Sequence, residues 1–169
     1  MRQGNIISYV LYFLLFFLLQ IILFRNVVLF GYASCFIYLG YILIFPFDSK
    51  PVVLILISFF FGLLIDSFYD TIGINAFICV LVAYYRNFVI KILTPAGGYD
   101  SSSEFTVSYM GLIWFVKYAA LIIFVHHFLF FLLEAWNIKE FFEVLVRAIF
   151  SSVFTLSVLL IQQYLFKKD

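Results

Sequence analysis

Two aspartates, Asp66 and Asp70, lie four residues apart in the stretch GLLIDSFYDTIG, in a chain with only 9 acidic residues. They follow the apolar run VVLILISFFF. Such a pair could catalyse acid–base chemistry, bind an ion or a ligand, or mark where a helix leaves a membrane. Aspartyl catalysis requires two carboxylates that share a proton across a substrate. Because these two lie on one element and no G-x-G-D motif is present, we expect no catalytic role for the pair.

The spacing of the same stretch favours a structural face. If the helix persists, Gly62, Asp66, Asp70 and Gly73 share one side of it. Small residues there allow another helix to approach closely. A carboxylate in a membrane costs about 2.5–3.5 kcal/mol at the helix centre, so it should face the bundle or a cavity. Asp66 is therefore either an ion, ligand or proton site, or a helix-end carboxylate bonded to a neighbour. Asp70, just before TIGINAF, suits an N-terminal cap for the next helix.

Other polar residues form no catalytic or metal-binding pattern. His126 and His127 are adjacent, so on a helix they point in directions about 100° apart and cannot both face one site. No Cys, Asp or Glu lies three or four residues away to complete a metal site. Cys35 and Cys79 lie in apolar runs and are expected to be packed thiols. We therefore predict that the protein is not an enzyme and holds no metal or cofactor.

The composition of the chain indicates which medium surrounds it. Of its 169 residues, 66% are hydrophobic and 11% are charged, whereas soluble domains carry about 25% charged residues. The mean hydropathy is +1.17. This indicates an integral membrane protein whose main surroundings are the lipid bilayer. There is no basic tract that would bind nucleic acid.

The apolar runs predict an all-α polytopic membrane protein with a single domain, residues 1–169. The first run is too long for a signal peptide and suits a spanning helix of about 20 residues. A membrane barrel would need alternating strands of about ten residues, which are absent from the sequence. We expect six transmembrane helices, at about residues 5–24, 27–45, 52–69, 74–92, 109–133 and 141–166.

The positive residues predict the orientation. With six spans both termini lie on one side, and the side richer in Lys and Arg is usually cytoplasmic. We expect Lys117 to snorkel to that surface and Glu143 and Arg147 to form a surface ion pair at helical spacing. The predicted cytoplasmic residues are Arg2, Lys50, Arg86, Lys91, Lys167 and Lys168, and the predicted external residues are Arg25, Lys139 and Arg147.

The pattern formed by Gly62, Asp66 and Gly73 in FFGLLIDSFYDTIGINAF resembles the rod shape-determining MreD family. Total length, short loops and Arg86, taken as early in the fourth-to-fifth loop, add to the resemblance. It implies a non-enzymatic subunit of the bacterial inner membrane that regulates cell shape and peptidoglycan synthesis. The partners it implies are MreC, the actin-like MreB, and the SEDS glycosyltransferase with its class B penicillin-binding transpeptidase.

The MreD family is thought to share its six-helix bundle with the S components of energy-coupling-factor vitamin transporters, and this supplies an alternative function. S components usually carry a substantial first external loop and A-x-x-x-A patches in the first helix. Here only Arg25 and Asn26 join the first two apolar runs, and SYVLYFLLFFLLQ has no such patch. Both absences favour the MreD interpretation. A proton-coupled transporter that uses Asp66 is a third class.

Overall fold

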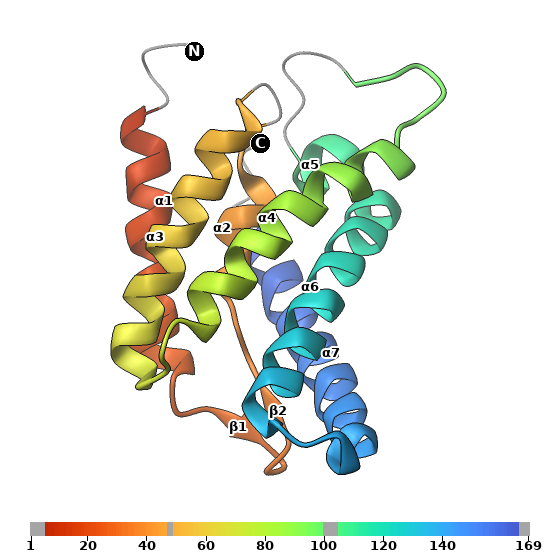
Figure 1. Cartoon of the computed structure of the whole chain (residues 1–169). Coiled ribbons are helices and arrows are strands. Elements are labelled where there is room, and N and C mark those ends of the chain that lie inside the picture. Colours follow the sequence, from red (N-terminus) through yellow and green to blue (C-terminus); the bar gives the residue numbers. More distant parts are fainter. Residues whose placement is uncertain (1–5, 47–48, 100–104, 166–169) are drawn as a thin grey trace.

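The computed structural model describes residues 6–46, 49–99 and 105–165. They form a helical bundle in which α1 and α3 run in the same direction, whereas α3, α4, α6 and α7 alternate in direction (Figure 1). The elements in chain order are α1 (Ile6–Leu18), the π-helix η1 (Leu19–Phe24), β1 (Val28–Leu29), β2 (Ala33–Ser34), α2 (Leu39–Ile44), α3 (Pro51–Tyr69), α4 (Ile74–Ile92), α5 (Val107–Met110), α6 (Leu112–Ala135), the 3-10 helix η2 (Ile138–Glu140) and α7 (Phe141–Leu165).

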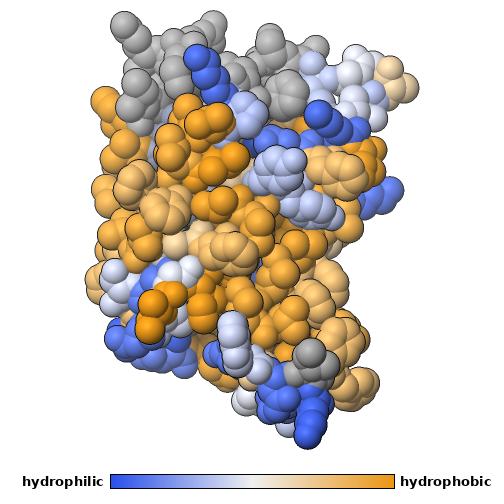
Figure 2. Space-filling view, in the orientation of Figure 1, coloured by the Kyte–Doolittle hydropathy of each residue, from blue (hydrophilic) through white to orange (hydrophobic). Residues whose placement is uncertain are grey.

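Five of the described helical segments are long and apolar enough to cross a membrane: Ile7–Phe24, α3, α4, α6 and α7. A broad apolar belt covers the middle of the molecule in Figure 2, and hydrophilic residues gather towards its two ends. Such a belt is expected where lipid chains replace water. The prediction of an all-α polytopic membrane protein is therefore confirmed.

The prediction of a membrane-spanning helix at residues 27–45 is wrong, and so is the expectation that only Arg25 and Asn26 join the first two helices, since residues 25–38 separate η1 from α2. The chain there forms a short antiparallel hairpin in which Val28 pairs with Ser34 and Leu29 with Ala33. Phe30 and Gly31 turn the hairpin with φ angles of 54° and 74°. After β2 the chain returns through the bundle as irregular backbone and reaches α2, which has only six residues (Figure 1).

We call residues 33–38 the non-helical segment. Apart from Ser34, which is half-buried, all its residues are buried. Backbone that is not helical is tolerated at membrane depth only where protein or a water-filled cavity surrounds it. The segment lies against α7 through β2, so its apolar composition reflects burial in the protein and not contact with lipid.

The helices differ in how deeply they lie in the bundle. Half of the residues of α4 are buried, but only 11% of those in the Ile7–Phe24 span are. The first span is held to the bundle at Phe16, which is fully buried and next to Gly40 of α2. A Cβ atom at Gly40 would collide with the ring of Phe16 and, at 2.6 Å, with Leu159 of α7. The first span is therefore peripheral, and most of its surface faces away from the protein.

The chain direction places four of the described cations at the two ends of the bundle. Lys50, before α3, and Lys91, in the last turn of α4, are at the end where α6 begins (Figure 1). Arg25, after η1, and Lys139, in η2, are at the opposite end. Arg2, Lys167 and Lys168, on which the predicted orientation also depends, lie outside the described residues. Which end faces the cytoplasm stays a prediction.

Candidate functional site

Asp66 is the centre of the turn between α3 and α4. Its side chain is on α3 and only 5% of the residue is exposed. Oδ2 accepts a hydrogen bond from the backbone N–H of Ala76 at 2.9 Å, and Oδ1 accepts from that of Asn75 at 3.0 Å. Oδ1 also accepts from the side chain of Asn75 at 3.1 Å and from the hydroxyl of Thr71. The carboxylate thus satisfies free N–H groups in the first turn of α4, where a negative charge is favourable.

Asp70 does not cap α4, and that prediction is wrong. It ends α3 in the left-handed conformation, with φ of 54°, and its own N–H bonds to the carbonyl of Asp66. Its side chain is 93% exposed and lies 3.9 Å from Arg25. The residue before α4 is Gly73, which has no side chain to cap with. Because the chain reverses within three residues, the first turn of α4 lies beside Asp66 and not beside Asp70.

The two glycines of the motif have different functions. A Cβ atom at Gly62 would lie 2.5 Å from Cα of Ala76 and 2.7 Å from the carbonyl oxygen of Asn75, so α3 and α4 touch backbone to backbone there. At Gly73 nothing lies within 4 Å of such an atom, but φ is +77°, which favours glycine. Gly62 therefore provides space, and Gly73 provides the backbone conformation that starts α4.

A line of polar side chains leads from Asp66 into the middle of the bundle. The amide nitrogen of Asn75 donates to Asp66 and to Thr71, so its oxygen faces the hydroxyl of Tyr38, which donates to it at 3.0 Å. Since that donation uses the single hydroxyl proton of Tyr38, Nε2 of His126, at 2.6 Å, must carry a proton and donate to the Tyr38 oxygen. Nδ1 of His126 is buried and has no hydrogen-bond partner among the described atoms.

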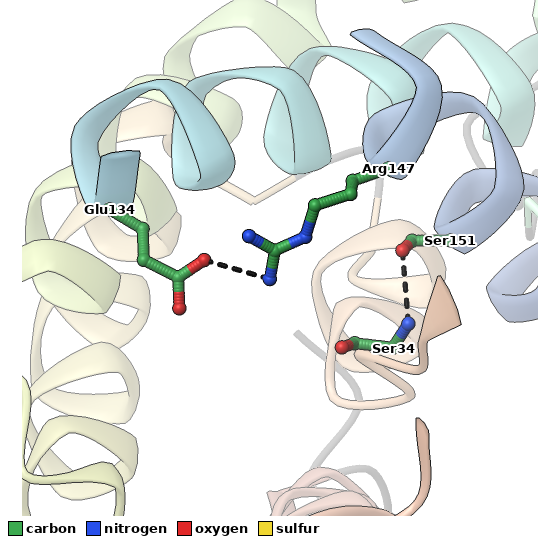
Figure 3. A network of polar contacts seen from close by, with 4 residues as sticks. All are labelled: Ser34, Glu134, Arg147 and Ser151. Carbon is green, nitrogen blue, oxygen red and sulfur yellow. Dashed lines mark hydrogen bonds and ion pairs between the residues drawn. The ribbon is translucent and has the colours of Figure 1, made fainter. Parts of the chain in front are cut away.

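The non-helical segment receives its hydrogen bonds from side chains on two helices. The backbone N–H of Ser34 donates to the hydroxyl oxygen of Ser151 at 3.0 Å (Figure 3), and that of Phe36 donates to Thr155 at 3.1 Å. Gln20 of η1 donates to the carbonyl of Cys35 at 3.1 Å and is also within 3.4 Å of the N–H of Tyr38. These side chains replace the bonds that a helix would have supplied.

Sequence reasoning missed Gln20, Ser151 and Thr155. Two features of the sequence could have revealed them. The first apolar run contains one amide, Gln20, and the last run contains Ser151 and Thr155, four residues apart on one helix face. All three are buried, with no exposed area at Thr155. Polar side chains at such positions indicate a partner within the bundle.

His127 supports the same segment through Thr155. Its Nδ1 lies 2.8 Å from the carbonyl oxygen of Ile123, so Nδ1 carries the proton. Nε2 then accepts from the hydroxyl of Thr155 at 3.0 Å, and this leaves the Thr155 oxygen to accept from Phe36. Both histidines are fully buried, and they bond to different elements. The two rings therefore serve two separate polar contacts, as expected for adjacent helical residues.

Arg147 and Glu134 join α7 to the end of α6 (Figure 3). They lie 3.0 Å apart, and the guanidinium also sits 4.4 Å from the centre of the Phe131 ring. The predicted pairing of Arg147 with Glu143 is not formed among the described residues. The Glu134–Arg147 pair borders a cavity of about 90 Å³ whose walls include Arg25, Phe36 and Tyr69.

Arg86 is not in a loop, and that expectation is corrected. It lies inside α4, where it is 2% exposed. Its Nε donates to the hydroxyl of Tyr118 on α6 at 2.8 Å, and Nη2 donates to the carbonyl of Phe45 just after α2. The ring of Phe105 lies 5.3 Å away. Arg86 thus ties α2, α4 and α6 together inside the bundle.

No group of three or more His, Cys, Asp or Glu that could hold a metal ion occurs within the described ranges. Cys35 and Cys79 are both buried and free.

Comparisons with known proteins match this chain to no family model, no curated protein and no solved structure. The arrangement around Asp66 can therefore be interpreted only from its own contacts.

Proposed function

We propose that this chain is a non-enzymatic subunit of the bacterial cell-elongation machinery that acts by binding membrane partners. The proposal rests on the resemblance of the Gly62, Asp66 and Gly73 pattern to the MreD family. The observation that carries it is the use of Asp66, whose two oxygens accept four hydrogen bonds from three neighbouring residues of the same chain. A carboxylate so engaged stabilises the fold, so Asp66 itself is not free to act on a substrate.

The peripheral first span supports a function in binding another membrane protein. Its exposed aliphatic side chains recur at helical spacing, so they form a stripe along one side of the span. They are Ile7, Val10, Leu11, Leu14, Leu18, Ile22 and Leu23. In a membrane such a stripe faces either lipid or another helix. The transmembrane segment of an MreC-like protein would pack here.

The wider assembly follows from the same proposal. The chain would reside in the bacterial inner membrane with both termini in the cytoplasm, the orientation that the positions of Lys and Arg in the sequence predict. From there it would regulate cell shape and peptidoglycan synthesis through the MreC-like protein. MreB and the SEDS glycosyltransferase with its class B penicillin-binding transpeptidase would be the further members of the complex.

Co-purification with an MreC-like protein in nanodiscs tests this proposal. A photo-crosslinking residue at Leu11, which is 60% exposed on α1, should capture that protein. The same residue at Phe150, which is 58% exposed on α7, is the matched control. Co-purification with a crosslink only from position 11 supports the proposal. Failure to co-purify would overturn it.

The second candidate is a vitamin-binding S component, and the cavity beside Glu134 and Arg147 favours it. Aromatic and charged side chains line this cavity, as a ligand site requires, but its volume is about 90 Å³. Pockets for small molecules usually measure about 300–1,000 Å³, so we rank this function second. Tight vitamin binding in calorimetry, without co-purification of an MreC-like protein, would replace the first proposal with the second.

A further inference from the structure

A wide groove of about 700 Å³ lies where α4 ends, α5 ends and α6 begins. Its lining is apolar except for one cation. The lining residues are Leu93, Met110, Gly111, Leu112, Ile113, Trp114 and Lys117. The groove is at the opposite end of the bundle from Asp66 and the hairpin (Figure 1).

The backbone at Gly111 keeps the groove open. This glycine has φ of +81° and separates the four-residue helix α5 from α6. No residue of α5 is fully buried, although Val107 and Met110 pack against the core. The interruption of the helix at Gly111 therefore leaves a notch at the end of a membrane-spanning helix.

One wall of the groove is held rigidly. The indole N–H of Trp114 donates to the carbonyl of Leu93 at 3.0 Å, which links α6 to the end of α4. The indole also stacks on Tyr118, with ring centres 4.9 Å apart, and on Phe105, at 5.3 Å. The groove is thus a built feature of the bundle, because a fixed aromatic ring prevents its collapse.

In a membrane, a groove at the start of a spanning helix would lie where lipid chains meet headgroups. Lys117 is five residues after Leu112, the first residue of α6, so it lies about 7.5 Å along the helix axis. Ile113, which is 74% exposed, presents aliphatic surface beside it. A lysine at this depth extends its ammonium towards the phosphate level while its methylene groups stay against apolar surface.

Among the described residues that line the groove, Lys117 is the only charged one, and it is exposed. The ion pairs within the described residues are Arg25–Asp70 and Arg147–Glu134, both at the other end of the bundle. A basic pocket between helices at a membrane surface attracts anionic lipid headgroups.

We infer that this groove binds one anionic phospholipid, with its phosphate at the ammonium of Lys117, beside Leu112 and Ile113, and its acyl chains running from there along α6 into the bilayer. The lipid would fill the notch that Gly111 leaves, and it would anchor the start of α6 at the membrane surface. This inference concerns a different surface from the first span and does not depend on the proposed partner.

Native mass spectrometry of the full chain tests the inference. The protein would be released from nanodiscs that contain phosphatidylglycerol or phosphatidylcholine, and the retained lipids counted. The wild-type chain should retain one phosphatidylglycerol in preference to phosphatidylcholine. Lys117→Gln should weaken phosphatidylglycerol retention by roughly fivefold, the effect of one cation near a membrane surface. Lys91→Gln removes an exposed charge outside the groove lining and should change nothing.

Two further measurements test the apolar part. Ile113→Trp should fill the groove and reduce retention while Lys117 remains. A photo-crosslinking residue at Ile113 should capture lipid in native membranes. Equal retention of both lipids, no effect of Lys117→Gln, or capture of a polypeptide at position 113 would each overturn the inference.

Discussion

The carboxylate of Asp66 caps a helix to which it does not belong: its Oδ2 lies 2.9 Å from the backbone nitrogen of Ala76, in the first turn of α4. Asp66 is near the end of α3, so its side chain joins the end of α3 to the start of α4. The dipole of α4 directs its positive end at this charge. The residue most suggestive of chemistry in the sequence is therefore an internal helix cap.

Asp66→Asn should destabilise the protein although it preserves the shape of the side chain. The amide would replace one carboxylate oxygen with an NH2 group, which would face the N–H of either Ala76 or Asn75 in place of an acceptor. Loss of hydrogen bonds to a charged acceptor costs about 1.5–3 kcal/mol. Thermal unfolding in nanodiscs measures the change. Asp70→Asn is the control, because that side chain is 93% exposed and makes only a 3.9 Å ion pair. Equal effects of both changes would contradict the capping function.

Gly62→Ala should separate α3 from α4. The added Cβ would lie 2.5 Å from Cα of Ala76, which is backbone and cannot rotate away. Overpacking of this kind costs about 1–3 kcal/mol. Gly97→Ala adds the same methyl group where nothing lies within 4 Å, so it should have little effect. The unfolding temperatures of the two variants check this, and an unchanged Gly62→Ala protein would show that the helices can shift without cost.

The sequence was sufficient to predict the long helices because a lipid-facing segment is recognisable from its apolar length. The predicted span 74–92 coincides with α4, and 52–69 differs from α3 by one residue at its start. Pro51 marks that start, since proline suits the first turn of a helix. Apolar length and turn residues are local properties, so they can be recognised in the sequence without knowledge of the tertiary structure.

The non-helical segment could not be predicted in the same way. An apolar run that is buried in protein and one that faces lipid have the same composition. What distinguishes residues 33–38 is the supply of hydrogen bonds from Gln20, Ser151 and Thr155, two of which are more than a hundred residues away in sequence. Asp66 and Asp70 could not be told apart for a similar reason, because the cap depends on how the chain reverses between α3 and α4.

Glu134, and not Glu143, should stabilise the end of α6 through Arg147. Glu134→Gln removes the 3.0 Å ion pair, whose partners are 45% and 29% exposed. The expected loss is at most about 1 kcal/mol, since partly exposed pairs are screened by water and salt. Glu143→Gln should leave the unfolding temperature unchanged at low salt. If Glu143→Gln were the more harmful change, the pairing described here would be wrong.

Thr155→Val should weaken the non-helical segment while it preserves the volume of the side chain. Thr155 accepts the backbone N–H of Phe36 and donates to His127, so valine would leave a buried N–H and a buried ring nitrogen without a partner. Each such group costs about 1–3 kcal/mol. Hydrogen exchange at the amide of Phe36 should accelerate, whereas amides of α3 should not change. Ser157→Ala is the control on the same helix, because that hydroxyl is exposed and bonds only to Val153 in its own helix. Unaltered exchange at Phe36 in Thr155→Val would mean that packing alone, and not this hydrogen bond, holds the segment inside the bundle.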